Sequence, residues 1–143
     1  MMISTKGRYA LRVMIELAQR QEEGYISLKE VAQNQEISEK YLEAIMKNLV
    51  TAGLAVGMRG KGGGYRLARP AAECSAGEIL QAAEGSLAPV ACLSQGPRPC
   101  PRGGECRTLP MWKELDRRVN EYLDSVTVAD LAACAGSGDD YVI

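Results

Sequence analysis

The sequence predicts a mainly α-helical protein with one small β-hairpin. Apolar residues recur at helical spacing in several segments, and two segments with period-two alternation flank a single glycine-rich stretch. The third observation is a proline- and glycine-rich loop that holds three of the five cysteines. With 143 residues and 46% hydrophobic content, the chain is long enough to bury one modest core, but not two large ones.

Three helices are expected in the first third of the chain. The first runs from Ser4 to about Arg20, where the apolar positions follow one helical face. Residues 27–30 have the form of a capping box, which begins a short helix through about Gln33. Ser38 caps a third helix whose apolar residues fall at i, i+3, i+4 and i+7, namely Leu42, Ile45, Met46 and Leu49.

Residues 34–37, between the second and third of these helices, allow only a tight turn. Two helices joined so closely, the second longer and polar on its outer face, form a helix-turn-helix. Such helix pairs also occur as structural fillers, so this pattern alone does not define a function.

A β-hairpin with a basic, glycine-rich tip follows the third helix. Residues 54–59 and 65–69 alternate around residues 60–64, and glycines at a tip allow positive φ and close approach to a surface. Arg59 and Lys61 suit a narrow, electronegative minor groove. The alternatives are a plain hairpin or a phosphate-binding loop, but the tip lacks the spacing of nucleotide-binding motifs. A hairpin directly after such a helix pair predicts a winged helix-turn-helix.

The second half of the chain predicts a short helix, the cysteine loop, one long helix and a last short helix. Residues 75–78 form another capping box, and residues 127–130 cap the last helix. Pro110 starts a helix of roughly 17 residues, about 25 Å long. The loop alone cannot cover its apolar stripe, so we expect a second copy of the chain there, or the first helix of the same chain. The stripe consists of Trp112, Leu115, Val119, Tyr122, Leu123 and Val126.

Charge is divided unevenly between the two halves. Residues 1–70 carry eleven Lys and Arg against seven Asp and Glu, a net charge of +4, while residues 71–143 carry −5. This is expected when only one half faces a polyanion, although scatter in a small chain produces similar values. The sequence has no apolar leader with a cleavage site and no run of 18 apolar residues, so we expect a cytoplasmic protein without membrane contact.

Three cysteines lie in one loop at the spacing Cys92-x7-Cys100-x5-Cys106, and the chain has no histidine. Any metal here is therefore held mainly by thiolate sulfur, which indicates iron–sulfur chemistry or zinc. Thiols stay reduced in the cytoplasm, so an odd set of five cysteines favours ligands over disulfides. A thiol redox switch without metal, and thiols with no role, are the alternatives.

Several separated segments resemble the bacterial IscR/NsrR/RirA/CymR-type (Rrf) family of transcriptional regulators. They are STKGRYA at residues 4–10, ISEKYLE at 37–43 and RGKGGGYRLARP at 59–70, together with the cysteine loop. The resemblance implies a homodimeric winged helix-turn-helix protein that binds two-fold sites in double-stranded DNA. Many members, though not the cysteine-metabolism branch, bind an iron–sulfur cluster through the cysteines of this loop.

In such a fold the N-terminal turns of the third helix meet base edges in the major groove. Here these turns present Glu39, Lys40, Glu43 and Lys47. Because phosphates repel a carboxylate, Glu43 indicates a hydrogen bond with a cytosine amine, unless it only pairs with Lys47 at i+4. Phosphate or minor-groove contacts are expected from Lys6, Arg8, Tyr41, Arg59, Lys61 and Arg66.

The resemblance implies that the three loop cysteines, Cys92, Cys100 and Cys106, hold a [2Fe–2S] or [4Fe–4S] cluster whose fourth ligand is open. Relatives with a [2Fe–2S] cluster have a histidine three residues after the third cysteine, where this chain has Leu109. Other relatives use an acidic residue near the start of the partner's first helix, where this chain has Arg8. The remaining candidates are Glu105, Cys74, an acidic residue of the partner subunit or a small exogenous ligand.

Four regions are expected: a DNA-binding domain (1–70), a linker helix with the sensor loop (71–109), a dimerisation helix with a short terminal helix (110–134) and a flexible tail (135–143). The sequence offers no histidine for a triad, no paired carboxylates and no phosphate loop, so we expect no enzyme. We expect a cluster-sensing regulator. The alternatives are a regulator switched by thiol oxidation or a partner protein, a zinc-bound form, and an electron-transfer or cluster-carrier protein, which would not need the basic wing.

Overall fold

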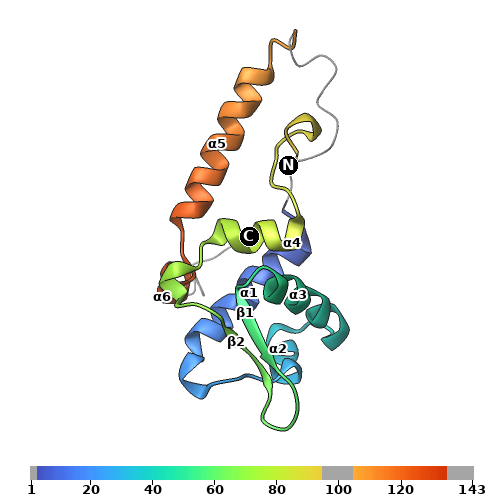
Figure 1. Ribbon diagram of the computed structural model, residues 1–143, viewed down its shortest axis with the longest axis vertical. Coiled ribbons are helices and arrows are strands. Elements are labelled where there is room, and N and C mark those ends of the chain that lie inside the picture. The colour runs from blue at the N-terminus through green and yellow to red at the C-terminus, as the bar shows by residue number, and fades with distance from the viewer. Residues whose placement is uncertain (1–2, 95–104, 135–143) are drawn as a thin grey trace, which may run out of the picture.

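The structure, a computed structural model, describes residues 3–94 and 105–134, and it confirms the expected fold class. These residues form helices and one two-stranded antiparallel hairpin (Figure 1). The helices are α1 (Thr5–Gln19), α2 (Leu28–Gln35), α3 (Glu39–Thr51), α4 (Ala76–Glu84), α5 (Leu109–Ser125) and α6 (Val128–Ala133). The strands are β1 (Ala55–Met58) and β2 (Gly64–Leu67), and short 3₁₀ turns are η1 (Gln21–Glu23), η2 (Ala71–Glu73) and η3 (Ala91–Leu93).

The hydrophobic core lies around α1, which packs against α2, α3, α4 and α6. The buried face of α3 consists of the apolar positions that the helical spacing predicted. Cys74 and Val128, from segments much further along the chain, are fully buried in the same core. Helices α4 and α6 therefore complete the core of the helix-turn-helix half.

The turn between α2 and α3 is shorter than the sequence predicted. The prediction ended the second helix near Gln33, but α2 continues through Gln35. It ends because Glu36 takes a left-handed conformation with φ 56°, and its amide bonds back to the last helical carbonyls. Ser38 then caps α3, with its hydroxyl accepting a hydrogen bond from the Tyr41 amide at 3.1 Å.

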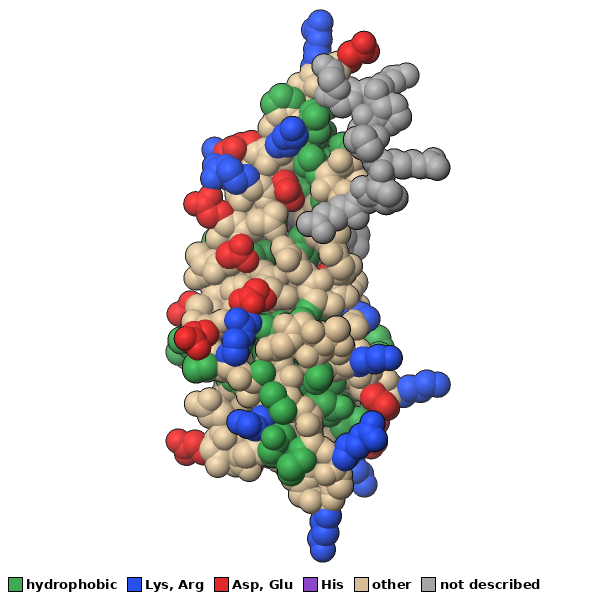
Figure 2. All heavy atoms as spheres, in the orientation of Figure 1, with side chains coloured by type: hydrophobic (Ala, Val, Ile, Leu, Met, Phe, Trp, Pro, Cys, Tyr) green, Lys and Arg blue, Asp and Glu red, His purple; other side chains and the backbone are tan. Residues whose placement is uncertain are grey.

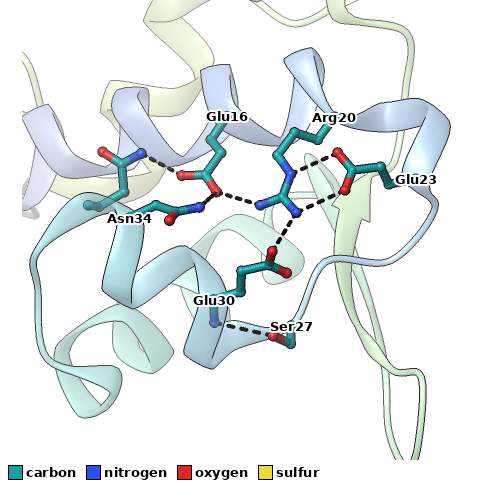
Figure 3. A network of polar contacts seen from close by, with 7 residues as sticks. Glu16, Arg20, Glu23, Ser27, Glu30 and Asn34 are labelled. Carbon is teal, nitrogen blue, oxygen red and sulfur yellow. Dashed lines mark hydrogen bonds and ion pairs between the residues drawn. The ribbon is translucent and has the colours of Figure 1, made fainter.

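A polar network joins α1 to α2 (Figure 3). At its centre the Glu16 carboxylate, which is 7% exposed, accepts hydrogen bonds from Arg20 at 3.1 Å, Asn34 at 2.9 Å and Gln35 at 2.6 Å. Asn34 and Gln35 are the last two residues of α2, so the carboxylate holds the end of that helix against α1. The network thereby links the end of α2 to α1 through side chains.

The capping box expected at residues 27–30 forms only in half. The Ser27 hydroxyl accepts a hydrogen bond from the Glu30 amide at 3.2 Å, but the Glu30 carboxylate binds Arg20 at 2.7 Å instead of turning back to Ser27 (Figure 3). A hydrogen bond between charged partners is stronger than one to a neutral amide, so the nearby guanidinium is preferred. Hydrogen bonds to Glu23, Glu30 and Glu16 raise the pKa of Arg20.

We expect Glu16→Ala to lower the free energy of unfolding by about 1–3 kcal/mol, because it leaves polar groups of α2 beside the core without their acceptor. The measurement is urea unfolding followed by circular dichroism. The control is Glu22→Ala, at an exposed position of η1, which should leave the midpoint unchanged. Equal midpoints for the two variants would mean that the network does not stabilise the fold.

The expected hairpin is confirmed, and a third segment pairs with it. Strands β1 and β2 run antiparallel with Ala55 opposite Leu67 and Met58 opposite Gly64. Ile26 pairs with Tyr65 through two backbone hydrogen bonds of 2.9 and 2.8 Å. A side chain on Gly64, whose φ is 149°, would overlap the Ile26 carbonyl, so glycine is required where the hairpin crosses this segment.

Helix α5 projects from the body, and its C-terminal end is anchored to α4 (Figure 1). The Ala76 amide donates to the Val126 carbonyl at 2.7 Å, and the Val128 amide donates to the Cys74 carbonyl at 2.8 Å. Gly77 faces Asp124 so closely that a methyl group there would overlap the carboxylate. Among the described residues, no helix is both long and apolar enough to cross a membrane.

Five of the six residues of the apolar stripe predicted on the long helix lie on α5, whereas Val126 follows the end of the helix in an extended conformation. The described chain covers this stripe only in part, since Leu115 and Tyr122 are exposed and the other four residues are partly buried. None of the 17 residues of α5 is buried within this chain. Leu115 is 40% exposed, Tyr122 68% and Met111, next to the stripe, 54%. Elsewhere on the helix, Arg117 pairs with Glu114 and Glu121. Apolar side chains along this helix are visible in the upper part of Figure 2.

Candidate DNA interface and cysteine loop

Helix α3 presents a continuous polar face to solvent. Glu39, Lys40, Glu43 and Lys47, the residues predicted to meet base edges, are all exposed, while the opposite face is buried in the core. Among the described residues, the ion pairs involve other side chains, so the alternative pairing of Glu43 with Lys47 is not found. A carboxylate without a partner is therefore held at the centre of this face.

A groove of about 660 Å³ separates α3 from the hairpin. One wall carries Glu43 and Lys47, and the other carries Arg59 at the start of the tip. Two exposed apolar side chains, Val50 at 39% and Met58 at 44%, also line it. These two apolar side chains were not predicted from the sequence, because Met58 comes to face α3 only through the hairpin register. Further lining residues are Ser27, Leu28, Thr51, Gly57, Gly60, Gly63, Gly64 and Tyr65.

The first half of α1 lies beside the start of α3. The rings of Tyr9 and Tyr41 meet edge to face with centroids 6.1 Å apart, and the Arg12 guanidinium lies 4.9 Å from the centre of the Tyr9 ring. Lys6 and Arg8, predicted to contact phosphates, are in the first turn of α1, immediately before Tyr9. In Figure 2, Lys and Arg side chains gather on the right of the lower part of the molecule and at its lower tip.

Arg66 is placed apart from the groove. Strand alternation directs Tyr65 into the groove and Arg66 to the opposite face of the hairpin. There its guanidinium lies 5.1 Å from the centre of the Tyr25 ring. The predicted DNA-contacting residues of α3 and the hairpin tip, including Arg59 and Lys61, therefore lie on elements that border the groove. Lys6 and Arg8 lie on α1, which does not line the groove, and Arg66 faces away from it.

Residues 85–94, which lead into the cysteine loop, follow the end of α4 (Figure 1). Leu93 lines a small pocket together with Asp116 and Asn120 of α5. Cys92 lies in η3 and is exposed, and Cys106 lies just before α5 and is half-buried. Cys100, with the prolines and glycines around it, is outside the described residues. Within the described part of the chain, no group of three His, Cys, Asp or Glu side chains is arranged to hold a metal ion.

Cys106 is held in a setting that favours its thiolate form. Its sulfur lies 3.3 Å from the Thr108 hydroxyl. Hydrogen bonds from that hydroxyl and from the backbone amides of Thr108 and Leu109 lower the pKa of Cys106. The thiolate is the form of cysteine that binds metals and reacts with oxidants, so Cys106 fits either use.

Cys74, one candidate for a fourth cluster ligand, is a core residue. Its side chain has no exposed surface, and burial raises its pKa. It lies at the C-terminal end of α5, whereas Cys106 precedes the N-terminal end of that 17-residue helix. About 25 Å of helix therefore separates Cys74 from the loop of the same chain. Glu105, another candidate, is exposed directly beside Cys106.

A helix-turn-helix followed by a basic hairpin defines a winged-helix DNA-binding protein, and comparison with known proteins assigns it further. The chain belongs to the Rrf2 family, described as an iron-dependent transcriptional regulator, whose profile matches residues 3–134. It is 35% identical to the transcriptional regulator IscR of Serratia proteamaculans over 131 residues, which are 92% of this chain and 79% of that protein.

Two solved structures of regulators resemble the whole chain. CymR, the global cysteine regulator of B. subtilis, has a TM-score of 0.75 and 40% sequence identity, with 95% of this chain and 99% of that chain covered. The T. potens IscR structure has a TM-score of 0.72 and 35% identity, with 99% and 97% covered. The chain is accordingly a DNA-binding transcriptional regulator of the Rrf2 family, and not an enzyme.

Proposed function

We propose that this regulator binds a two-fold DNA site as a homodimer, with α3 in the major groove and the hairpin in the adjacent minor groove. The observation that carries the proposal is the groove between them, bordered by Lys47 on one side and Arg59 on the other. One DNA strand separates a major groove from its neighbouring minor groove, so a protein that enters both must leave room for that strand. Positive side chains on both borders suit its phosphates.

Base recognition is assigned to the exposed polar face of α3. Among the described residues Glu43 has no ion-pair partner, so among phosphates it is repelled unless it accepts a hydrogen bond from a cytosine N4 amine. Lys40 and Lys47 can donate to guanine or to phosphate. Contacts from Lys6, Arg8, Tyr41, Arg59 and Lys61 would position the protein, while Glu43 would select the sequence.

We expect the affinity for such a site to fall steeply with salt, with log K against log[salt] at a slope of about −7 for about eight phosphates per dimer.

Glu43→Ala should relax the preference at one base pair while binding to other sites stays equal or increases. Arg59→Ala should weaken all sites with a narrow minor groove. The measurements are fluorescence anisotropy at several salt concentrations and a binding selection from random DNA. Salt-independent binding would contradict the DNA proposal, and an unchanged base preference would leave Glu43 as a solvated residue.

The second part of the proposal is that α5 forms the dimer interface. A helix without a buried residue, with exposed apolar side chains on one face and ion pairs on another, is suited to bury that face against a second copy. We assign this role to Trp112, Leu115, Val119, Tyr122, Leu123 and Val126. In this proposal residues 110–134 dimerise, residues 1–70 bind DNA and residues 71–109 sense.

The third part is that Cys92, Cys100 and Cys106 hold an iron–sulfur cluster. The lowered pKa of Cys106 and the exposure of Cys92 support it, since cluster ligands are thiolates that iron must reach. A bound cluster supplies a group that reacts with oxygen or nitric oxide and depends on iron supply. The same thiolate also supports a second candidate, a cluster-free regulator switched by thiol oxidation. A regulator that acts on the chromosome would work in the cytoplasm.

A further inference from the structure

Glu84, the last residue of α4, is bound to the beginning of α1. Its carboxylate oxygen Oε1 accepts hydrogen bonds from the backbone amide of Ser4 at 2.8 Å and from the Ser4 hydroxyl at 2.6 Å. The same hydroxyl accepts a hydrogen bond from the Gly7 amide and so caps α1. Oε1 of Glu84 therefore extends the N-terminal cap of α1, although Glu84 lies 80 residues further along the chain than Ser4.

Gly7 makes room for this contact. The glycine is buried, and a methyl group on its α-carbon would overlap Oε1 of Glu84. No local conformation demands glycine here, because Gly7 is an ordinary residue of α1 and does not have positive φ. The missing side chain is thus explained by the approach of the carboxylate.

The electrostatics of the two helices act in opposite directions on this carboxylate. A negative charge at the C-terminal end of α4 faces the partial negative charge of that helix, which is unfavourable. The same charge at the N-terminal end of α1 meets free amides and a partial positive charge, which is favourable. The negative charge of Glu84 is therefore electrostatically favourable at this position only because the N-terminal end of α1 lies next to it.

We infer that Glu84 is a positioning residue of the DNA-binding surface, since it holds the first turns of α1, which carry Lys6 and Arg8, in place. This inference rests on the proposed contacts of these two residues with DNA phosphates. Without Glu84, Ser4 loses the acceptor for two donors and the first turn of α1 frays. Because Gly85 and the segment that leads to Cys92 follow Glu84, the contact also links the approach to the cysteine loop to the helix that carries the proposed DNA contacts.

The test compares the full-length wild type with Glu84→Ala, Glu84→Gln and Gly7→Ala. We expect Glu84→Ala to weaken operator binding roughly tenfold at moderate salt and to make the salt slope shallower by up to about 3.6, since four phosphate contacts of the dimer loosen. Glu84→Gln keeps an acceptor of the same shape and should bind within about twofold of the wild type. Hydrogen exchange should accelerate at the amides of residues 4–8 in Glu84→Ala.

Gly7→Ala separates positioning from general stability. Alanine is a better helix former than glycine by about 1 kcal/mol, so helix propensity alone predicts that the substitution makes α1 more stable. If Glu84 positions the helix, the added methyl group displaces the carboxylate, and the variant should lose DNA affinity and salt slope as Glu84→Ala does.

The matched control is Glu78→Ala, a glutamate of the same helix that binds Arg69 at 2.6 Å and closes the capping box of α4. It should lower the melting temperature without changing the salt slope or the exchange of residues 4–8. A wild type that fails to bind DNA with a steep slope would contradict the proposed function. A steep slope that Glu84→Ala and Gly7→Ala both retain, with unchanged exchange, would overturn the role of Glu84 alone.

Discussion

Replacing Leu115 and Leu123 together by aspartate will produce a monomer that no longer holds a two-fold DNA site. Both positions belong to the apolar stripe of α5, and Leu115 is 40% exposed in the single chain. In a dimer each aspartate would be buried without a partner, which costs several kcal/mol. We expect the dimer to weaken by more than roughly 100-fold, which sedimentation velocity at micromolar concentration will detect.

The same variant should keep its fold, because α5 contributes no buried residue to the core of the chain. Its circular dichroism spectrum should therefore match that of the wild type. A matched control introduces two aspartates outside the stripe, at Lys113 and Arg118, where solvent hydrates them. That control loses only an exposed ion pair and should remain a dimer. An intact dimer in the stripe variant would place the interface on another surface.

Cys106→Ala should abolish the visible absorption of anaerobically purified protein and leave DNA binding in a single, cluster-independent mode. Cys106 is the proposed ligand whose pKa the structure lowers, so its replacement removes one thiolate from the proposed cluster site. Cys92→Ala and Cys100→Ala should have the same effect. Absorption spectroscopy, iron and sulfide content, and DNA affinity with and without reconstitution measure it.

Two other cysteines serve as controls for that experiment. Cys134 is exposed and outside the loop, so Cys134→Ala should retain the colour. Cys74→Ala should also retain it, at reduced stability, because Cys74 is buried at the far end of α5. Trp112, in the first turn of α5, offers a second signal, since its emission should be quenched in the coloured form and recover after a chelator removes the iron.

Reconstitution that yields a colourless protein with stoichiometric zinc, or with no metal, would contradict the cluster proposal. In that case the lowered pKa of Cys106 would support the thiol-oxidation alternative instead. Alkylation of Cys106 in the metal-free protein should then change the affinity for DNA.

Local patterns were sufficient to predict most of the secondary structure. Ser38, Ser75 and Thr127 cap helices where the sequence placed them, and the boxes at Ser75 and Thr127 close with their own i+3 acids. Such contacts span three residues, so the chain itself keeps the partners together whatever the rest of the fold does. The hairpin and the apolar face of α3 were predictable for the same reason, because their periodicity is a property of neighbouring residues.

Tertiary structure decided the contacts in which partners at long range compete with local ones. Glu30 should close a box with Ser27 by its spacing, yet it binds Arg20, because packing of α2 on α1 brings a cation within reach. Cys74 looks like a possible ligand by type, but the packing of α4 and α6 buries it in the core. Glu84 and Ser4 are hydrogen-bonded although 80 residues separate them in the chain. Neither local sequence contains a pattern that predicts this contact. The sequence by itself determined the helices, the hairpin and most of the helix caps, because these depend on neighbouring residues. The groove, the burial of Cys74 and the contact between α4 and α1 depend on residues that are distant in the chain and that only folding brings together.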